Sequence, residues 1–345
     1  AVKKPLVVLD RVNPIGGEKV EGTVCPENMH TMVGDYRLAQ RTGLTSGEFA
    51  RYVNGEYAIG CDLHVVPVSG WQRRLYMDET DAPWVLPSPS LPHATANLLY
   101  AGMCIFEGVA TINEGRGTTQ PFTTVTAPYI TDADALAERL NGFGLDGVIF
   151  RPAHATTLST NQLLSGTDYV GTLAHGVQIH VTDKRAFSPI AMQVYLMLTL
   201  QAMYGWDNVT AAEKKDGNHF FTHYQLDYRA GSDWCSADLA AFPKGASDEQ
   251  IVAEAARMLA LMDEQTADYK VLREKYLLDE YNTPADKELV NTLEPQVVLG
   301  AETYLASATG KKVALVTNQS GVTTDLKHIA DVYAAAENVE LVSLI

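Results

Sequence analysis

Positively charged side chains are scarce in this sequence. Lysine and arginine number 26 against 42 aspartates and glutamates, so the 345-residue chain carries a formal net charge of −16. Proteins that bind nucleic acid need a basic face to neutralise phosphates, and this balance therefore argues against a nucleic-acid partner. An anionic ligand needs arginine or lysine side chains placed locally at its site.

Apolar runs and cysteine motifs are lacking too. No stretch reaches the roughly 18 apolar residues that a membrane span requires, and the first residues do not form a charged-then-apolar signal. Cys25, Cys61, Cys104 and Cys235 are scattered, with no Cys-x-x-Cys pair. We therefore expect no membrane span and no cysteine-based metal cluster, while disulfides are neither required at this size nor excluded.

The residues that are present predict a globular α/β protein long enough for two domains. Residues 5–9 and 62–67 form short apolar runs that predict strands, the first running into a polar turn. Between them, Thr45 and Glu48 have the spacing of a capping box and predict the start of a helix. A stiff, extended connection is then predicted by four closely spaced prolines: Pro83, Pro87, Pro89 and Pro92.

A second unit is expected to start near Ala127. Its predicted elements are helices at 135–140, 189–204 and 248–276 and strands at 147–150 and 177–181. A polar stretch at 280–287 indicates a linker. The last segment then predicts a helix at 298–308, a strand at 312–316, a helix at 324–336 and a strand at 339–345, an arrangement typical of a parallel α/β sheet. We therefore expect domains at 1–126 and 127–281, with 285–345 completing the first.

One glycine-rich segment contains several side chains that could take part in catalysis or binding. Glu107, Glu114 and Arg116 lie among glycines and small hydroxyl residues between Phe106 and Phe122. Glycines at this density are incompatible with a helix, and the polar groups are incompatible with a buried strand, so a shaped loop is expected. Such loops on a rigid scaffold often carry binding or catalytic groups. The alternative is a glycine turn with a surface Glu–Arg pair.

Three other patterns resemble sites only superficially. Residues 142–147 match G-x-G-x-x-G, but they follow a predicted helix and precede a strand, the reverse of the dinucleotide-binding order. Residues 310–312 resemble half of a P-loop but precede their strand. His219 and His223 have metal-ligand spacing, yet no glutamate follows His219 and two phenylalanines intervene, which favours a packed or surface pair.

Five strings occur together in an order that resembles a known family. They are LDRVNPIGG at 9–17, PWVLPSP at 83–89, FEG at 106–108, EGRGTT at 114–119 and GVQIHVTD at 176–183. Together they are similar to the exo-β-N-acetylmuramidases of the NamZ type, over residues 1 to about 281. The resemblance implies an enzyme that removes N-acetylmuramic acid from the non-reducing end of peptidoglycan fragments, without metal or nucleotide cofactor. It also implies a Rossmann-like larger domain, a smaller α/β domain and a site in the cleft between them.

The order of segments departs from the family. Residues 310–322 resemble the family's N-terminal strand and turn, yet they follow its C-terminal part. The family's Gly-Pro-Glu-His-Gly loop, a candidate for the acid/base carboxylate, does not occur in this sequence. We expect either a circular permutation or a missing segment, which a second chain or a further stretch of this protein supplies. Residues 285–345 are then expected to lie beside the strand at 5–9 in one sheet.

The resemblance and the residue chemistry together suggest roles. Glycoside hydrolysis commonly uses two carboxyl groups, one of them protonated, and Glu107 and Glu114 are the candidates. The lactyl carboxylate of muramic acid calls for an arginine fork, for which the candidates are Arg11, Arg116 and Arg151. Further substrate contacts are expected from Asn13, Asn318 and His180. Each of these side chains has the alternative of a purely structural role.

The missing Gly-Pro-Glu-His-Gly loop and departures at single positions keep a second function open. Thr42 stands where the family usually has histidine, and Gln120 where it usually has arginine. The alternative to a muramidase is therefore a catalytically impaired relative that binds muropeptides or another acidic sugar. Because peptidoglycan lies outside the cytoplasm, the resemblance implies a periplasmic or secreted protein.

Overall fold

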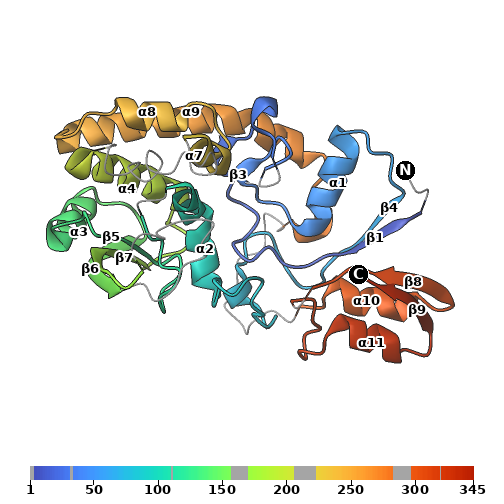
Figure 1. Cartoon of the computed structure of the whole chain (residues 1–345). Helices are drawn as coiled ribbons and strands as arrows, with labels where there is room; N and C mark the ends of the chain where they lie inside the picture. The colour runs from blue at the N-terminus through green and yellow to red at the C-terminus, as the bar shows by residue number, and fades with distance from the viewer. Residues whose placement is uncertain are drawn as a thin grey trace. The chain divides into compact units, whose positions relative to one another are not determined.

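The structure, a computed structural model, describes residues 4–31, 34–109, 112–156, 170–205, 223–282, 297–318 and 320–345 (Figure 1). The chain forms two compact units. Unit 1 comprises residues 1–19, 42–89 and 270–345, and unit 2 comprises residues 20–41 and 90–269. This division differs from the expected domains at 1–126, 127–281 and 285–345, because the chain passes repeatedly between the units.

Unit 1 begins with a pair of parallel strands. β1 (Leu6–Leu9) pairs with β4 (Leu63–Val66), in the register Leu6 to Leu63 through Leu9 to Val66. The helix α1 (Ser46–Glu56) lies between them in the sequence, as a parallel connection requires. The Thr45 hydroxyl accepts from the Glu48 amide, and the Glu48 carboxylate accepts from the Thr45 amide. The predicted capping box is confirmed.

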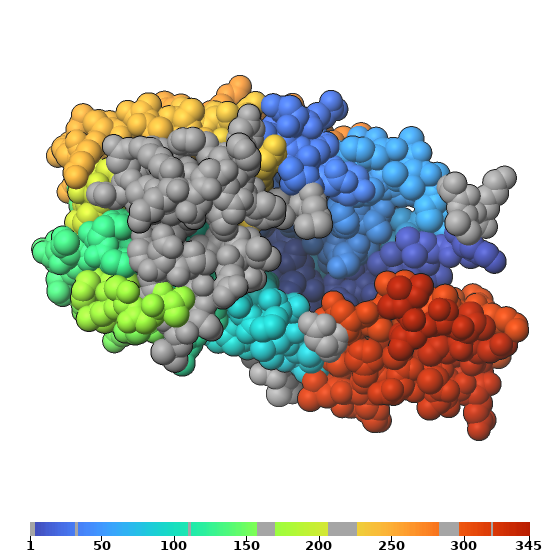
Figure 2. Space-filling view, in the orientation of Figure 1, coloured from blue at the N-terminus to red at the C-terminus, as the bar shows by residue number. Residues whose placement is uncertain are grey.

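The C-terminal segment of unit 1 is a second parallel pair. β8 (Lys311–Leu315) pairs with β9 (Val339–Leu344), and α10 (Gly300–Ser307) and α11 (Ile329–Ala335) accompany them. Figure 2 shows this segment as one contiguous block of surface. The helix predicted at 324–336 starts later than expected. Leu326 has a φ of 64°, and the Thr323 hydroxyl accepts from the Lys327 amide, so a turn occupies the expected first helical turn.

The two strand pairs of unit 1 contact each other through side chains. Leu9 packs against the buried cluster that contains Leu315 and Ile329. The Gly300 amide donates to the Asp10 carbonyl over 3.2 Å. The expectation that they form one sheet is wrong for the described residues, in which β1–β4 and β8–β9 are separate two-stranded sheets. The expected proximity is confirmed.

The predicted linker at 280–287 is also corrected at its start. Residues Asp279–Tyr281 form a short 3-10 helix, and Tyr281 is fully buried. Its ring lies edge-on to Trp71, with centroids 4.9 Å apart. The sequence does not reveal that Tyr281 is buried, because its acidic neighbours are typical of an exposed linker. Residues 283–287 lie outside the described part of the chain.

Unit 2 contains an antiparallel sheet in the order β5-β7-β6. The strands are β5 (Thr124–Ala127), β6 (Val148–Thr156) and β7 (Leu173–Val181), the last two longer than predicted. Gly176 lets β7 approach β5 closely, since a Cβ there would lie 1.9 Å from the Val125 carbonyl oxygen. A smaller antiparallel pair consists of β2 (Glu21–Val24) and β3 (Ala39–Arg41).

Unit 2 also contains helices, the last of which has its final residues in unit 1. They are α2 (Ala94–Met103), α3 (Ala133–Gly142), α4 (Pro189–Tyr204), α7 (His223–Ala230), α8 (Cys235–Ala241) and α9 (Asp248–Glu274). The predicted helix at 189–204 is confirmed at both ends, and its apolar character fits its burial. Within the described ranges, no helix is both long and apolar enough to cross a bilayer.

The glycine pattern at 142–147 occupies the position that the sequence predicts. Gly142 ends α3, and Gly144 and Gly147 have positive φ values of 65° and 70° in the turn before β6. The segment is a helix-to-strand turn, unlike a dinucleotide-binding loop. His219 lies outside the described residues, so the expected pair with His223 is not described.

Candidate functional site

The glycine-rich loop of unit 2 is built around Asn113. Its side-chain oxygen accepts from the Gly115 amide over 2.8 Å, and its amide group donates to the Arg116 carbonyl over 3.0 Å. Gly115 has a φ of 91°, and a Cβ there would lie 2.1 Å from the Gln120 carbonyl oxygen. Only glycine fits this turn, and the expected shaped loop is confirmed.

This loop brings two carboxylates to one guanidinium. The Arg116 Nε contacts Glu114 Oε1 in a short ion pair, and Arg116 Nη1 lies 3.5 Å from Glu107 Oε1. The Glu114 side chain has no exposed area, whereas 14% of the Glu107 side chain is exposed. The predicted residues Glu107, Glu114 and Arg116 are therefore brought together, and of the two carboxylates Glu107 is the one that solvent reaches.

A second arginine, Arg229 of α7, completes the cluster. Its Nε lies 3.6 Å from Glu107 Oε2. Burial raises the pKa of the Glu107 carboxyl above its ordinary value of 4.5, and Glu114 raises it further, while Arg116 and Arg229 oppose the shift. A half-buried carboxyl with a raised pKa suits proton donation near neutral pH.

Aromatic rings enclose one side of the cluster. The Arg116 guanidinium carbon lies 5.5 Å from the centroid of the Phe122 ring, and Tyr100 meets the same ring edge-on at 4.7 Å. Phe122 has a φ of 58°, a strained backbone for a bulky residue. Strain of this kind persists only where the surroundings enforce it and is found mainly at functional sites. Among the described residues, the buried Nη2 of Arg116 has no hydrogen-bond partner.

Two predicted site residues lie on the exposed face of the unit 2 sheet. Arg151 of β6 is paired with Gln178 of β7, and His180 is paired with Ile149, so Arg151 and His180 are diagonal neighbours. Both are exposed. Gln178 donates to Gln120 over 3.2 Å on the same face. These side chains are available to a ligand of unit 2.

The other predicted contacts belong to unit 1 and have structural partners. The Arg11 guanidinium donates to the Val322 carbonyl over 3.0 Å, and burial lowers its pKa. The Asn13 amide donates to the Leu44 carbonyl, and its oxygen accepts from Ile15. The Asn318 side chain accepts from the Ser320 amide and hydroxyl. Each of these residues stabilises its own turn or a neighbouring one.

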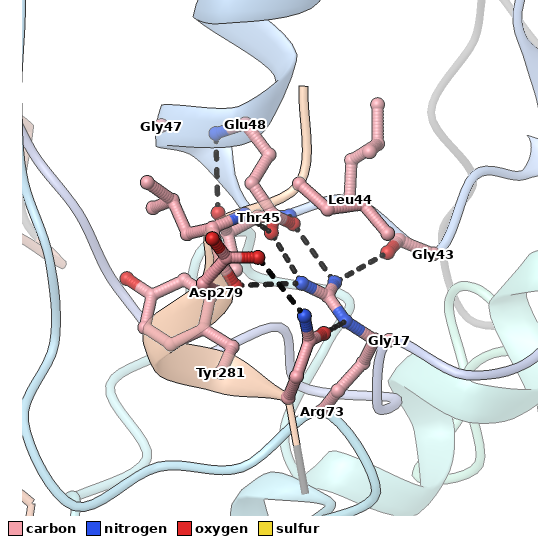
Figure 3. A network of polar contacts seen from close by, with 12 residues as sticks. Gly17, Gly43, Leu44, Thr45, Gly47, Glu48, Arg73, Asp279 and Tyr281 are labelled. Atoms are coloured by element: carbon pink, nitrogen blue, oxygen red, sulfur yellow. Dashed lines mark hydrogen bonds and ion pairs between the residues drawn. The ribbon is translucent and has the colours of Figure 1, made fainter. Parts of the chain in front are cut away.

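Unit 1 also contains a buried polar network, of which the sequence predicted only the Thr45–Glu48 capping box (Figure 3). Both guanidinium Nη atoms of Arg73 donate to the Glu48 carboxylate, over 3.0 and 2.5 Å. The fully buried Asp10 carboxylate accepts from the Thr45 hydroxyl, the Gly47 amide and the Tyr281 hydroxyl. This network joins the end of β1, the start of α1 and the segment before residue 283.

Known families account for most of the chain. Family models described as "Exo-beta-N-acetylmuramidase NamZ, N-terminal" and "Exo-beta-N-acetylmuramidase NamZ, C-terminal" match residues 1–95 and 98–278. The chain belongs to the NamZ family. The five strings that resemble this family lie within the two matches. Residues 279–345 lie beyond them.

One curated relative and two solved structures are similar to this chain. The chain is 36% identical over 249 residues to peptidoglycan β-N-acetylmuramidase NamZ of Bacillus subtilis (strain 168), covering 72% of this chain and 55% of the relative. A DUF1343 family protein from Bacteroides fragilis superposes with a TM-score of 0.68 at 28% identity, covering 80% of this chain and 66% of that chain. A second protein of that family and organism, 23% identical with a TM-score of 0.58 over 81% of this chain and 67% of that chain, shares the fold.

The chain thus spans little more than half of the curated NamZ relative it matches. The expectation of a second chain or additional segment finds no support in these comparisons. They also do not identify site residues.

Arg229 is the cluster member that the sequence did not predict, because nothing in its local context connects it to Glu107.

Proposed function

We propose that this NamZ-family chain is a glycoside hydrolase that removes N-acetylmuramic acid from the non-reducing ends of peptidoglycan fragments. Family membership supports the reaction class. The observation that favours unit 2 as its location is the partly exposed Glu107 carboxyl, with its raised pKa, between two arginines.

In this proposal Glu107, Glu114 and Arg116 have different roles in glycosidic bond cleavage. Glu107 donates a proton to the leaving oxygen as the bond to the sugar breaks, and a water molecule then bonds to the anomeric carbon and returns a proton to the Glu107 carboxylate. Glu114 is enclosed and ion-paired, so it acts in the site by fixing Arg116. The unused Nη2 of Arg116 offers a donor to the lactyl carboxylate, a group that distinguishes muramic acid from N-acetylglucosamine.

The remaining predicted contacts belong to the same proposal. Arg151 and His180 are exposed on one sheet face and suit the sugar or its peptide. Arg11, Asn13 and Asn318 act as substrate contacts only if their present turn partners are exchanged for substrate groups, and we rank them lower for that reason.

The test uses an aryl N-acetyl-β-muramide, with the matching aryl glucosaminide as control substrate. We expect chromophore release from the muramide alone. E107Q removes the donated proton and is expected to lower kcat by about 100-fold or more. E138Q changes an exposed glutamate of α3 and is the matched control. Muramic acid binding without any release from the muramide contradicts the hydrolase and supports a binding protein instead.

The finer architecture and the location are part of this proposal. The parallel pairs β1–β4 and β8–β9, with α1, α10 and α11 beside them, favour a Rossmann-like arrangement in permuted order. An experimental structure in which β8–β9 makes no contact with Leu9 or α10 contradicts it.

Because the proposed substrate lies outside the cytoplasm, we place the protein in the periplasm or the medium, which cell fractionation checks.

A further inference from the structure

Two histidines face each other on the β6–β7 ribbon of unit 2. His154 and His175 are directly paired in the antiparallel register, and their Nδ1 atoms lie 2.7 Å apart. The ring centroids are 5.0 Å apart. At this separation one Nδ1 donates and the other accepts, so the two rings share a single hydrogen. Directly paired residues project from the same face of a sheet, and both rings therefore direct a nitrogen to one point.

Among the described residues, the neighbours of this pair on its own sheet face carry no charge. Its described neighbours on the same sheet face, from the register and the alternation of the strands, are Ala127, Pro152, Thr156, Leu173 and Val177. None is acidic or basic. Gly176 holds β7 against β5 immediately beside His175, which fixes the backbone beneath the pair.

We propose that His154 and His175 form a binding site for a divalent late transition metal, with Zn²⁺ and Cu²⁺ as the expected ions. Imidazole nitrogens are preferred ligands of both. Two nitrogens bound to one ion at about 2.0–2.1 Å lie about 2.9 Å apart at a right angle and about 3.3 Å apart at the tetrahedral angle. The distance between the two Nδ1 atoms therefore needs to increase only slightly from its present 2.7 Å, while each ring turns so that its lone pair points at the ion and no longer at the other ring.

Binding breaks one N–H bond and forms another within the same imidazole ring. The hydrogen on one Nδ1 leaves it, and the same ring gains one on Nε2, so both Nδ1 lone pairs point at the metal and no net proton is released. Within the described ranges, no group of three or more His, Cys, Asp or Glu is placed to hold a metal ion. In this proposal water or an external ligand fills the remaining positions, as in zinc sites that keep an open position.

The experiment titrates the untagged full chain with Zn²⁺ in competition with a chromophoric chelator, and with Cu²⁺ followed by electron paramagnetic resonance. We expect the wild-type protein to compete for Zn²⁺ and its Cu²⁺ spectrum to show two coordinating nitrogens. H154A and H175A each remove one ligand and are expected to weaken binding by about 10-fold or more. H154Q and H175Q repeat the test with side chains that keep the polarity, and far-UV circular dichroism confirms their folding.

The matched control is H180A, which removes an exposed histidine from the same strand but from the opposite face. It is expected to bind both metals as the wild-type protein does. Equal affinity in the wild type, H154A and H175A overturns the proposal, as does a wild-type protein that fails to compete with the chelator. None of these readouts depends on glycosidase activity, so the inference stands or falls separately from the proposed function.

Discussion

The Tyr281 hydroxyl donates a 2.8 Å hydrogen bond to the Asp10 carboxylate, across 271 positions of the chain. The same hydroxyl accepts from the Val68 amide over 2.9 Å. Asp10 directly follows β1 and Val68 follows β4. Tyr281 belongs to a segment that the sequence alone indicates as a linker. The Tyr281 hydroxyl therefore links both strands of the β1–β4 pair to the segment that follows α9.

Removing this hydroxyl is expected to destabilise unit 1. In Y281F both the Asp10 carboxylate and the buried Val68 amide lose a partner, so the free energy of unfolding should fall by about 1–3 kcal/mol. Urea denaturation followed by tryptophan fluorescence measures the change, since Trp71 contacts the Tyr281 ring. Y304F, in α10 of the same unit, is the control and should leave stability within about 0.5 kcal/mol of wild type. Equal stability of Y281F and Y304F contradicts the structural role.

The Glu48–Arg73 ion pair should behave as a coupled unit. R73M leaves the buried Glu48 carboxylate without its guanidinium and is expected to cost about 3–5 kcal/mol, because an uncompensated buried charge is expensive. E48Q with R73M should cost clearly less than the sum of the single changes. A double-mutant cycle by urea denaturation gives the coupling, and additivity within about 0.5 kcal/mol argues against it.

The pKa of Glu107 gives the activity a defined pH dependence. A proton donor loses activity as it deprotonates, so the alkaline limb of kcat/KM should lie above the carboxyl's ordinary pKa of 4.5. Arg229 lowers this pKa, and R229Q should therefore move the limb to higher pH. R257Q, which removes an exposed arginine of α9, should not. A limb that stays in place in R229Q removes Glu107 from the role of acid.

The same shift has a consequence for stability. A carboxyl whose pKa is raised by folding favours the folded state at low pH, and this contribution is lost as the pH rises from 4.5 through the raised value. E107Q cannot ionise. Over that pH window the wild-type protein should lose stability relative to E107Q, which thermal denaturation at a series of pH values measures. An unchanged difference between the two proteins contradicts a raised pKa.

Two helical glycines provide a matched test of packing. A Cβ on Gly102 of α2 would lie 2.1 Å from the Pro189 carbonyl oxygen at the start of α4, while a Cβ on Gly142 of α3 would meet nothing within 4 Å. G102A should cost about 1–3 kcal/mol through overpacking. G142A should be neutral or stabilise by up to about 1 kcal/mol. Thermal denaturation distinguishes them, and similar melting temperatures contradict the close approach.

Much of the local structure could be predicted from neighbouring residues. The capping box of Thr45 and Glu48 is confirmed because both partners lie within one helical turn. The helix at 189–204 is confirmed because its apolar character is continuous. Tyr281 could not be placed, since its acidic neighbours resemble a linker while its own partners are remote in sequence.

In the candidate site, too, the sequence predicted contacts between neighbouring residues but missed a remote one. Glu107, Glu114 and Arg116 were predicted as a group because they share one glycine-rich loop, and they meet around one guanidinium. Arg229 reaches Glu107 only through packing of α7 near the 3-10 turn that carries Glu107, and no spacing rule connects the two. Contacts that depend on tertiary packing are invisible to a pattern read along the chain.

The start of α1 has a consequence for what unit 1 can attract. Its Gly47 amide donates to Asp10, and its Glu48 amide donates to Thr45. Gly47 is required there, because a Cβ would lie 2.8 Å from the Asp10 carboxyl carbon. Parallel α/β proteins commonly hold a ligand's phosphate at such a helix start. Here the Asp10 carboxyl group of the chain itself takes that place, so the amide at the helix start is already bound from within unit 1.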